Sequence, residues 1–90
     1  MFKFRNVLLQ AAANGFAAGE ISRDDLTRLR RFAFLAPPWK MYDLRTRVAG
    51  LAQAEGVLPE GIDWDSIPWD EILAFIQKLL EIILAFILAI

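Results

Sequence analysis

The sequence predicts an all-α protein, in which a small head of three helices precedes a long apolar C-terminal helix. Apolar residues recur every three or four positions along most of the chain, as they do on one face of a helix. Ser22, the pair Pro37–Pro38 and Gly56 interrupt this pattern with residues that cap or break helices. Eighteen of the 24 residues 67–90 are apolar, and this segment is therefore expected to pack in an oligomer or in a membrane.

The first predicted helix runs from about Phe4 to Ala18 and ends before Gly19, which suits the position that follows a helix C-terminus. The second predicted helix begins after Ser22, whose hydroxyl is expected to accept a hydrogen bond from the amide of Asp25. The apolar residues of this second helix are expected to form its buried stripe: Leu26, Leu29, Phe32, Phe34 and Leu35.

The third predicted helix begins at Pro38, because proline suits the first turn of a helix and also stops a helix that precedes it. Gly56 is expected to end this helix. Residues 1–56 thus form a basic helical head, and residues 57–66 form an acidic linker that contains tryptophan.

A four-residue pattern, Ile-x-Trp-Asp, occurs twice, at residues 62–65 and 67–70. Two placements suit its tryptophans, Trp64 and Trp69. One is a boundary between apolar and aqueous surroundings, which the indole ring favours, and the other is packing over the end of the helical head. The sequence leaves both placements open.

Ser66 is the predicted N-cap of the C-terminal helix, and no helix breaker follows Pro68 in the sequence. A continuous helix over residues 67–90 would be about 36 Å long, which is close to the ~30 Å apolar core of a bilayer. Length alone therefore permits the segment to span a membrane.

Gln77, Lys78 and Glu81 fall on one side of this predicted helix and form a polar seam. Inserting each of the two charges into lipid costs about 2.5–3.5 kcal/mol, which roughly cancels the gain from the apolar neighbours. We therefore favour packing against protein over insertion into a membrane. The residues expected to be covered by neighbouring subunits or by lipid are Trp69, Ile72, Phe75, Ile76, Leu79, Leu80, Ile83, Phe86 and Ile87.

The pentapeptide Ile-Leu-Ala-Phe-Ile occurs at residues 72–76 and again at residues 83–87. Eleven residues make three turns of a helix, so a continuous helix would present both copies on the same face. Such a repeat favours several copies of the helix packing side by side.

The charges are divided unequally between the two halves of the chain. Residues 1–50 carry nine basic and four acidic side chains, whereas residues 51–90 carry one basic and seven acidic ones. This asymmetry predicts either pairing between the halves or an anionic partner, such as nucleic acid or lipid headgroups, for the head. The arginines expected to face that partner are Arg23, Arg28, Arg30, Arg31, Arg45 and Arg47.

The composition argues against an enzyme. The chain contains no cysteine and no histidine, so cysteine nucleophiles, the commonest general base and the commonest metal ligand are missing together. The carboxylates of Asp63, Asp65 and Asp70 lack the glycine and the distal glutamate of a calcium-binding loop. We therefore expect no catalytic residue, no cofactor, no metal and no small-molecule substrate.

These patterns predict a structural or assembly protein, whose C-terminal helix mediates homo-oligomerisation or docks the chain into a larger assembly such as a virion. One alternative is a membrane protein of the pore-forming, holin-like or tail-anchored kind, with Lys78 and Glu81 lining a lumen. A further alternative is a nucleic-acid binder, since a helix, a turn with glycine and an arginine-rich second helix are typical of helix-turn-helix proteins. The expected location is the cytoplasm or a virion, with membrane association under the first alternative.

Overall fold

The computed structural model describes residues 2–89, with the side chains of Phe2 and Trp64 excepted. Within this range the chain forms helices and no strand, which confirms the all-α class. The elements are α1 (Phe2–Ala17), α2 (Arg23–Leu35), α3 (Pro38–Ala54), the short 3-10 helices η1 (Trp64–Ser66) and η2 (Trp69–Ile72), α4 (Leu73–Lys78) and α5 (Leu80–Ala89).

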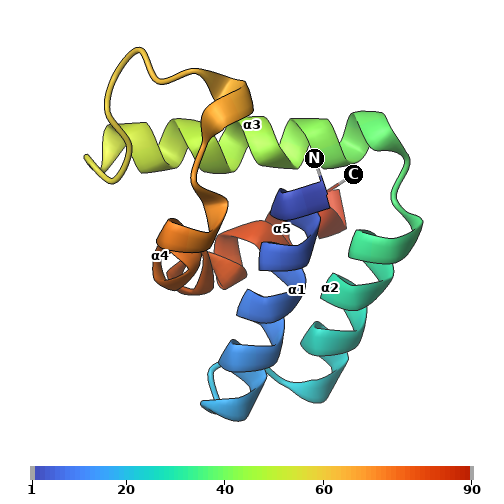
Figure 1. Cartoon of the computed structure of the whole chain (residues 1–90). Helices are drawn as coiled ribbons and strands as arrows, with labels where there is room; N and C mark the ends of the chain where they lie inside the picture. The colour runs from blue at the N-terminus through green and yellow to red at the C-terminus, as the bar shows by residue number, and fades with distance from the viewer. Residues whose placement is uncertain (1, 90) are drawn as a thin grey trace.

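The helix α1 lies at the centre of the arrangement (Figure 1). It runs antiparallel to α2 on one side and packs against α4 on the other, and α5 passes behind it towards α2. The helix α3 crosses one end of the α1–α2 pair. The segment after α3 then returns along the side of the molecule to η2 and α4, which brings the apolar C-terminal residues back onto the head.

Local signals in the sequence set the turn between α1 and α2 as predicted. Gly19 adopts a positive φ of 75°, and the amide of Glu20 donates to the carbonyl oxygen of Gly15 at 2.8 Å. This pattern ends a helix with its last carbonyl groups satisfied. At the start of α2, the Ser22 hydroxyl accepts from the amide of Asp25 at 3.1 Å, and the Asp25 carboxylate accepts from the amide of Ser22 at 3.4 Å.

The predicted start of the C-terminal helix at Ser66 is wrong. Ser66 is the last residue of η1, and its hydroxyl donates to the Asp63 carboxylate at 3.5 Å instead of capping a following helix. Ile67 is extended, with φ −63° and ψ 125°, because a residue that precedes proline is held out of the helical region. Regular α-helix therefore begins only at Leu73.

The predicted single helix over residues 67–90 is also wrong, because the chain bends by 81° between Lys78 and Leu80. Leu79 lies at the bend with φ −91° and ψ 3°, and its amide still donates to the carbonyl oxygen of Ile76 at 3.0 Å. The amide group at the bend therefore keeps a backbone hydrogen-bond partner. It allows α4 and α5 each to bury side chains against the head, which a straight helix would carry away from it.

A hydrophobic core joins the predicted head, linker and C-terminal segment. Phe4 of α1 packs edge to face on Trp69 of η2, with ring centroids 4.7 Å apart, and both side chains are buried. Leu58 and Ile67, from the stretch between α3 and η2, belong to the same buried cluster. Trp69 thus takes the packed placement of the two that the sequence allowed, whereas Trp64 lies outside the described side chains.

Candidate docking surface

Most of the apolar C-terminal residues expected to meet lipid or other subunits are covered by the chain itself. Six of them are buried, namely Trp69, Ile72, Ile76, Leu79, Leu80 and Ile83. The other three, Phe75, Phe86 and Ile87, are partly buried and pack against the core. Hydropathy predicts that such a segment is covered, but it gives no information on which surface the apolar residues will meet.

The described part of α5 keeps an exposed apolar strip on its outer side. Ile82 is 48% exposed and Leu88 is 66% exposed. The small side chains of Ala85, between them in sequence, and of Ala89, after them, are exposed as well. The first residue of the pentapeptide repeat is buried in both copies, at Ile72 and at Ile83. The bend nevertheless prevents the copies from sharing one straight face.

The polar seam lies beside the turn between α1 and α2. Gln77 donates a hydrogen bond from Nε2 to Oε1 of Glu20 at 2.8 Å, which links α4 to that turn across 57 residues of sequence. Lys78 and Glu81 line the same shallow pocket of about 190 Å³ together with Ile21. The structure therefore places the three seam residues, from two different helices, around one pocket against another part of their own chain.

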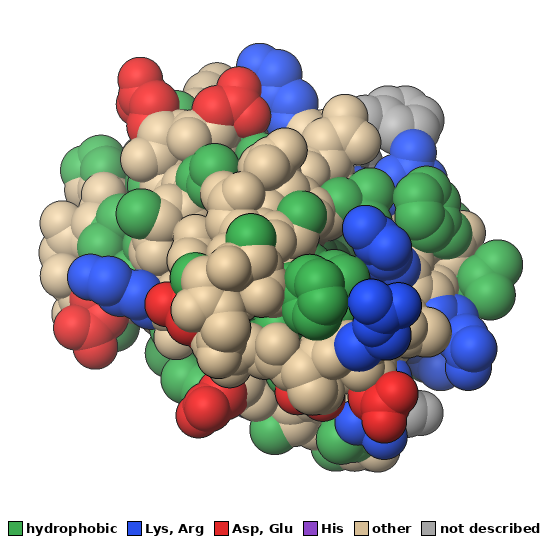
Figure 2. Space-filling view, turned by 90° about the horizontal axis from the view of Figure 1, so that it is seen from below, with side chains coloured by type: hydrophobic (Ala, Val, Ile, Leu, Met, Phe, Trp, Pro, Cys, Tyr) green, Lys and Arg blue, Asp and Glu red, His purple; other side chains and the backbone are tan. Residues whose placement is uncertain are grey.

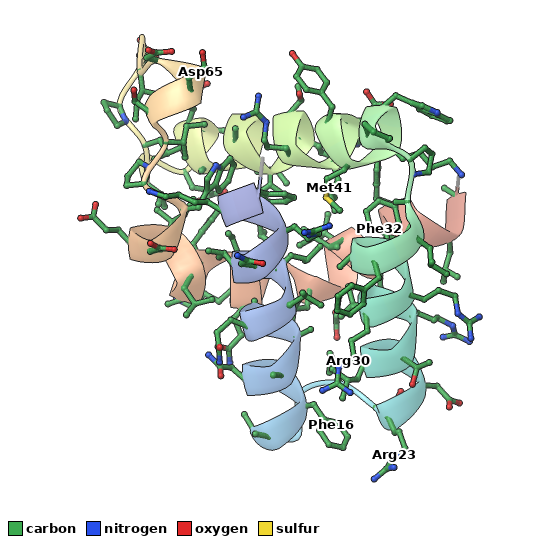
Figure 3. The ribbon with its side chains drawn as sticks, turned by 45° about the vertical axis from the view of Figure 1, so that its right-hand side comes forward. Phe16, Arg23, Arg30, Phe32, Met41 and Asp65 are labelled. Atoms are coloured by element: carbon green, nitrogen blue, oxygen red, sulfur yellow. The ribbon has the colours of Figure 1, made fainter. Side chains whose placement is uncertain are left out.

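The six arginines predicted to face an anion are divided among different surfaces. Arg23 and Arg30 line a groove of about 280 Å³ beside Phe16, as Figure 3 shows for the three labelled side chains. Arg45 lies over the ring of Tyr42 at 5.3 Å, and Arg47 lies over the ring of Phe86 at 4.7 Å.

The remaining two, Arg28 and Arg31, line another groove of about 310 Å³ where α2, α3 and α5 meet. Lys40 of α3 contributes a third cation to this groove, and Ile87 of α5 supplies part of its apolar wall. The ion pair between Arg28 and Asp25, with Nη1 and Oδ1 3.2 Å apart, is exposed and therefore contributes only about 0–1 kcal/mol. The Asp25 carboxylate still offsets the charge of Arg28, so the net positive charge of the groove comes from Arg31 and Lys40.

Leu35 lines this groove, and Trp39 and Leu88 are the chain neighbours of its lining residues Lys40 and Ile87. All three are large apolar side chains that project into solvent. Leu35 is 74% exposed, Trp39 61% and Leu88 66%. We call these three residues, together with Arg28, Arg31 and Lys40, the basic apolar corner. Figure 2 shows Lys and Arg side chains gathered with hydrophobic ones on the right-hand side of the molecule, where α2 lies.

The assignment of Phe34 and Leu35 to the buried stripe of α2 is wrong. Both are largely exposed, although Leu26, Leu29 and Phe32 of the same prediction are buried. The pair Pro37–Pro38 turns the chain directly after α2, so the last turn of this helix has neighbours on one side only. That proline pair is the sequence signal that could have marked Leu35 and Lys40 as parts of a protruding corner.

Among the described residues, no group of three or more acidic, cysteine or histidine side chains is placed to hold a metal ion. None of the helices in this part of the chain is by itself long and apolar enough to cross a membrane. Trp69–Lys78 and Leu80–Ala89 meet that requirement only as a pair, across the 81° bend. Comparison with known proteins gave no match to a family model, a curated protein or a solved structure.

Proposed function

We propose that this chain is a non-enzymatic assembly protein, which attaches to an anionic partner through the basic apolar corner. The observation that carries the proposal is the placement of three cations around a groove that is lined by the exposed Leu35 and that has the exposed Trp39 and Leu88 next to its lining residues in the chain. Monomeric soluble proteins seldom expose contiguous apolar patches beyond a few hundred Å², and such patches mark interaction sites. The cations fix the sign of the partner's charge.

Two further features support a binding role. Asp65 of the acidic linker lies far from the start of α3, where the corner is, in Figure 3. The absence of cysteine and histidine from the sequence removes the commonest catalytic groups. Binding, and not chemistry on a small substrate, is therefore the function that these residues serve best.

Binding of the full-length chain to three anionic probes tests the proposal: vesicles of acidic phospholipid, duplex DNA and polyglutamate. We expect at least one probe to bind, with an affinity that falls as salt rises. The double variant Arg31→Gln/Lys40→Gln should weaken that binding about tenfold or more. The matched control Arg23→Gln/Lys78→Gln removes two charges elsewhere and should have a much smaller effect. Absence of binding to all three probes at low salt would refute the proposal.

The exposed strip of α5 favours a second candidate function, self-association through the C-terminal segment. Ile82 and Leu88 are large, apolar and open to solvent at the outer side of the helix. If this strip joins copies of the chain, the mass measured by light scattering should correspond to a discrete oligomer. The variant Ile82→Ser/Leu88→Ser should then convert it to the monomer, whereas Val57→Ser, another exposed apolar position, should not. A monomer for the unmodified chain at all accessible concentrations would exclude this candidate.

A further inference from the structure

We propose that the anionic partner of the basic apolar corner is the surface of a lipid bilayer, which the folded protein binds peripherally. This inference rests on the docking function proposed above and specifies its partner. The cations would lie among acidic headgroups, and Leu35, Trp39 and Leu88 would enter the boundary between headgroups and acyl chains.

The exposed apolar residues distinguish lipid from nucleic acid. Leu35 and Leu88 are aliphatic and project freely, so a partner must offer an apolar environment to gain from them. A nucleic-acid duplex presents phosphates and base edges in its grooves and has no such environment for a leucine on a protruding corner. An acidic bilayer offers negative charge at its surface and hydrocarbon directly beneath it.

The aromatic residue of the corner has the chemistry of a membrane interface. Trp39 combines a large apolar ring with an N–H donor, and indole concentrates at the level of lipid headgroups for that reason. The ammonium of Lys40 lies 5.4 Å from the centroid of this ring, so a positive charge accompanies the indole at the same depth. The side chain of Leu35 lines the same groove as Lys40, so an aliphatic group also lies beside this charge.

The groove itself suits a phosphate headgroup. Arg28 and Arg31 lie one turn apart on α2 and share the groove with Lys40 of α3, so three cationic side chains border a volume of about 310 Å³. Within the described part of the chain no acidic residue lines this groove, while Leu35, Pro37 and Ile87 make its walls apolar. A phosphate at the cationic rim would therefore have its glycerol and upper acyl carbons beside an apolar surface.

The fold supports attachment to the surface in preference to insertion across the bilayer. Ile76, Leu80 and Ile83 are buried between α4, α5 and the head, so exposing them to lipid would require the core to open. The residues of the corner need no such rearrangement, because they are already exposed in the folded chain. Membrane binding through the corner is thus compatible with the intact core.

Vesicle flotation and quenching of tryptophan fluorescence by brominated lipid test the inference on the full-length chain. We expect binding to vesicles that contain acidic phospholipid and none to vesicles of phosphatidylcholine alone. Removing two charges with Arg31→Gln/Lys40→Gln should weaken binding about 25-fold, since each basic residue near an acidic surface contributes about a factor of five. Leu35→Ser/Leu88→Ser should weaken it about tenfold or more, with Val57→Ser as the matched control.

The quenching experiment uses the variant Trp64→Phe as its background, so that only Trp39 and the buried Trp69 fluoresce. Brominated lipid should quench the fluorescence of this variant, and the further change Trp39→Phe should abolish most of that quenching. Tighter binding to DNA or polyglutamate than to acidic vesicles, lost in Arg31→Gln/Lys40→Gln, would overturn the lipid inference and leave the docking function standing. Vesicle binding that is unchanged in Leu35→Ser/Leu88→Ser would also overturn it. Absence of binding to every probe would refute both proposals.

Discussion

Gly15 is a residue at which the head and the C-terminal segment lie in close contact. A Cβ atom added at this position would lie 2.6 Å from Cδ1 of Leu80, well inside van der Waals contact. Leu80 is itself buried, so its side chain has little room to move aside. The glycine therefore serves packing between α1 and α5, and its φ is not positive. From the sequence alone, Gly15 is only a residue of low helix propensity inside a predicted helix.

The variant Gly15→Ala should lower the free energy of unfolding by about 1–2 kcal/mol. Overpacking of a core costs about 1–3 kcal/mol, and the higher helix propensity of alanine offsets up to about 1 kcal/mol of that. Chemical denaturation monitored by circular dichroism measures the change. Combining Gly15→Ala with Leu80→Val, which shortens the opposing side chain, should cost less than the sum of the two single changes.

Gly50 provides the matched control for this prediction. It lies inside α3, and a Cβ atom added there would meet no neighbouring heavy atom of the described chain within 4 Å, so added bulk meets only solvent. Gly50→Ala should therefore raise the free energy of unfolding by about 0.5–1 kcal/mol. If both alanine variants changed stability by the same amount and in the same direction, the close contact between Gly15 and Leu80 would be disproved.

At the scale of the helices, local chemistry was predictable and tertiary bends were not. Gly19, Ser22 and the pair Pro37–Pro38 act on their own backbone neighbours, and each begins or ends a helix as expected. The bend at Leu79 has no such local cause, since leucine favours helix and no proline or glycine is near. It follows from burial of α4 and α5 against α1, which only the assembled core specifies.

The two serines that the sequence predicts as caps should differ in their effect on stability. Ser22→Ala should lower the free energy of unfolding by about 1 kcal/mol, because it removes a hydrogen bond to the first turn of α2. Ser66→Ala should change it by less than about 0.5 kcal/mol, because Ser66 is exposed and caps no helix. Thermal or urea unfolding of the two variants measures the contrast, and equal losses would contradict the capping assignments.

For the whole molecule, the candidate docking surface is partly visible in the sequence. The excess of basic residues in the first half indicates an anionic partner, and Arg28 and Arg31 are among the arginines that it points to. Periodicity assigns Leu35 to the core and gives no role to Lys40, because the groove is formed by three helices that meet only in the folded chain. Helical periodicity ranks the faces of one helix, but it gives no information on which end of that helix a neighbour will leave uncovered.

The hydrophobic core makes the head and the C-terminal segment mutually dependent. In the described structure α1 packs between α2 and α4, so a chain that ends at residue 56 would expose the side of α1 that meets α4 and Trp69. A domain of that size buries little apolar area and is only marginally stable, so losing this contact should unfold it. Residues 1–56 alone should therefore show weak helical circular dichroism and no cooperative thermal transition. Truncation after Ile87, which removes residues 88–90 and among them the exposed Leu88 and Ala89, should keep a cooperative transition. Cooperative unfolding of residues 1–56 with full helical signal would show instead that the head folds independently and that the shared core is dispensable for it.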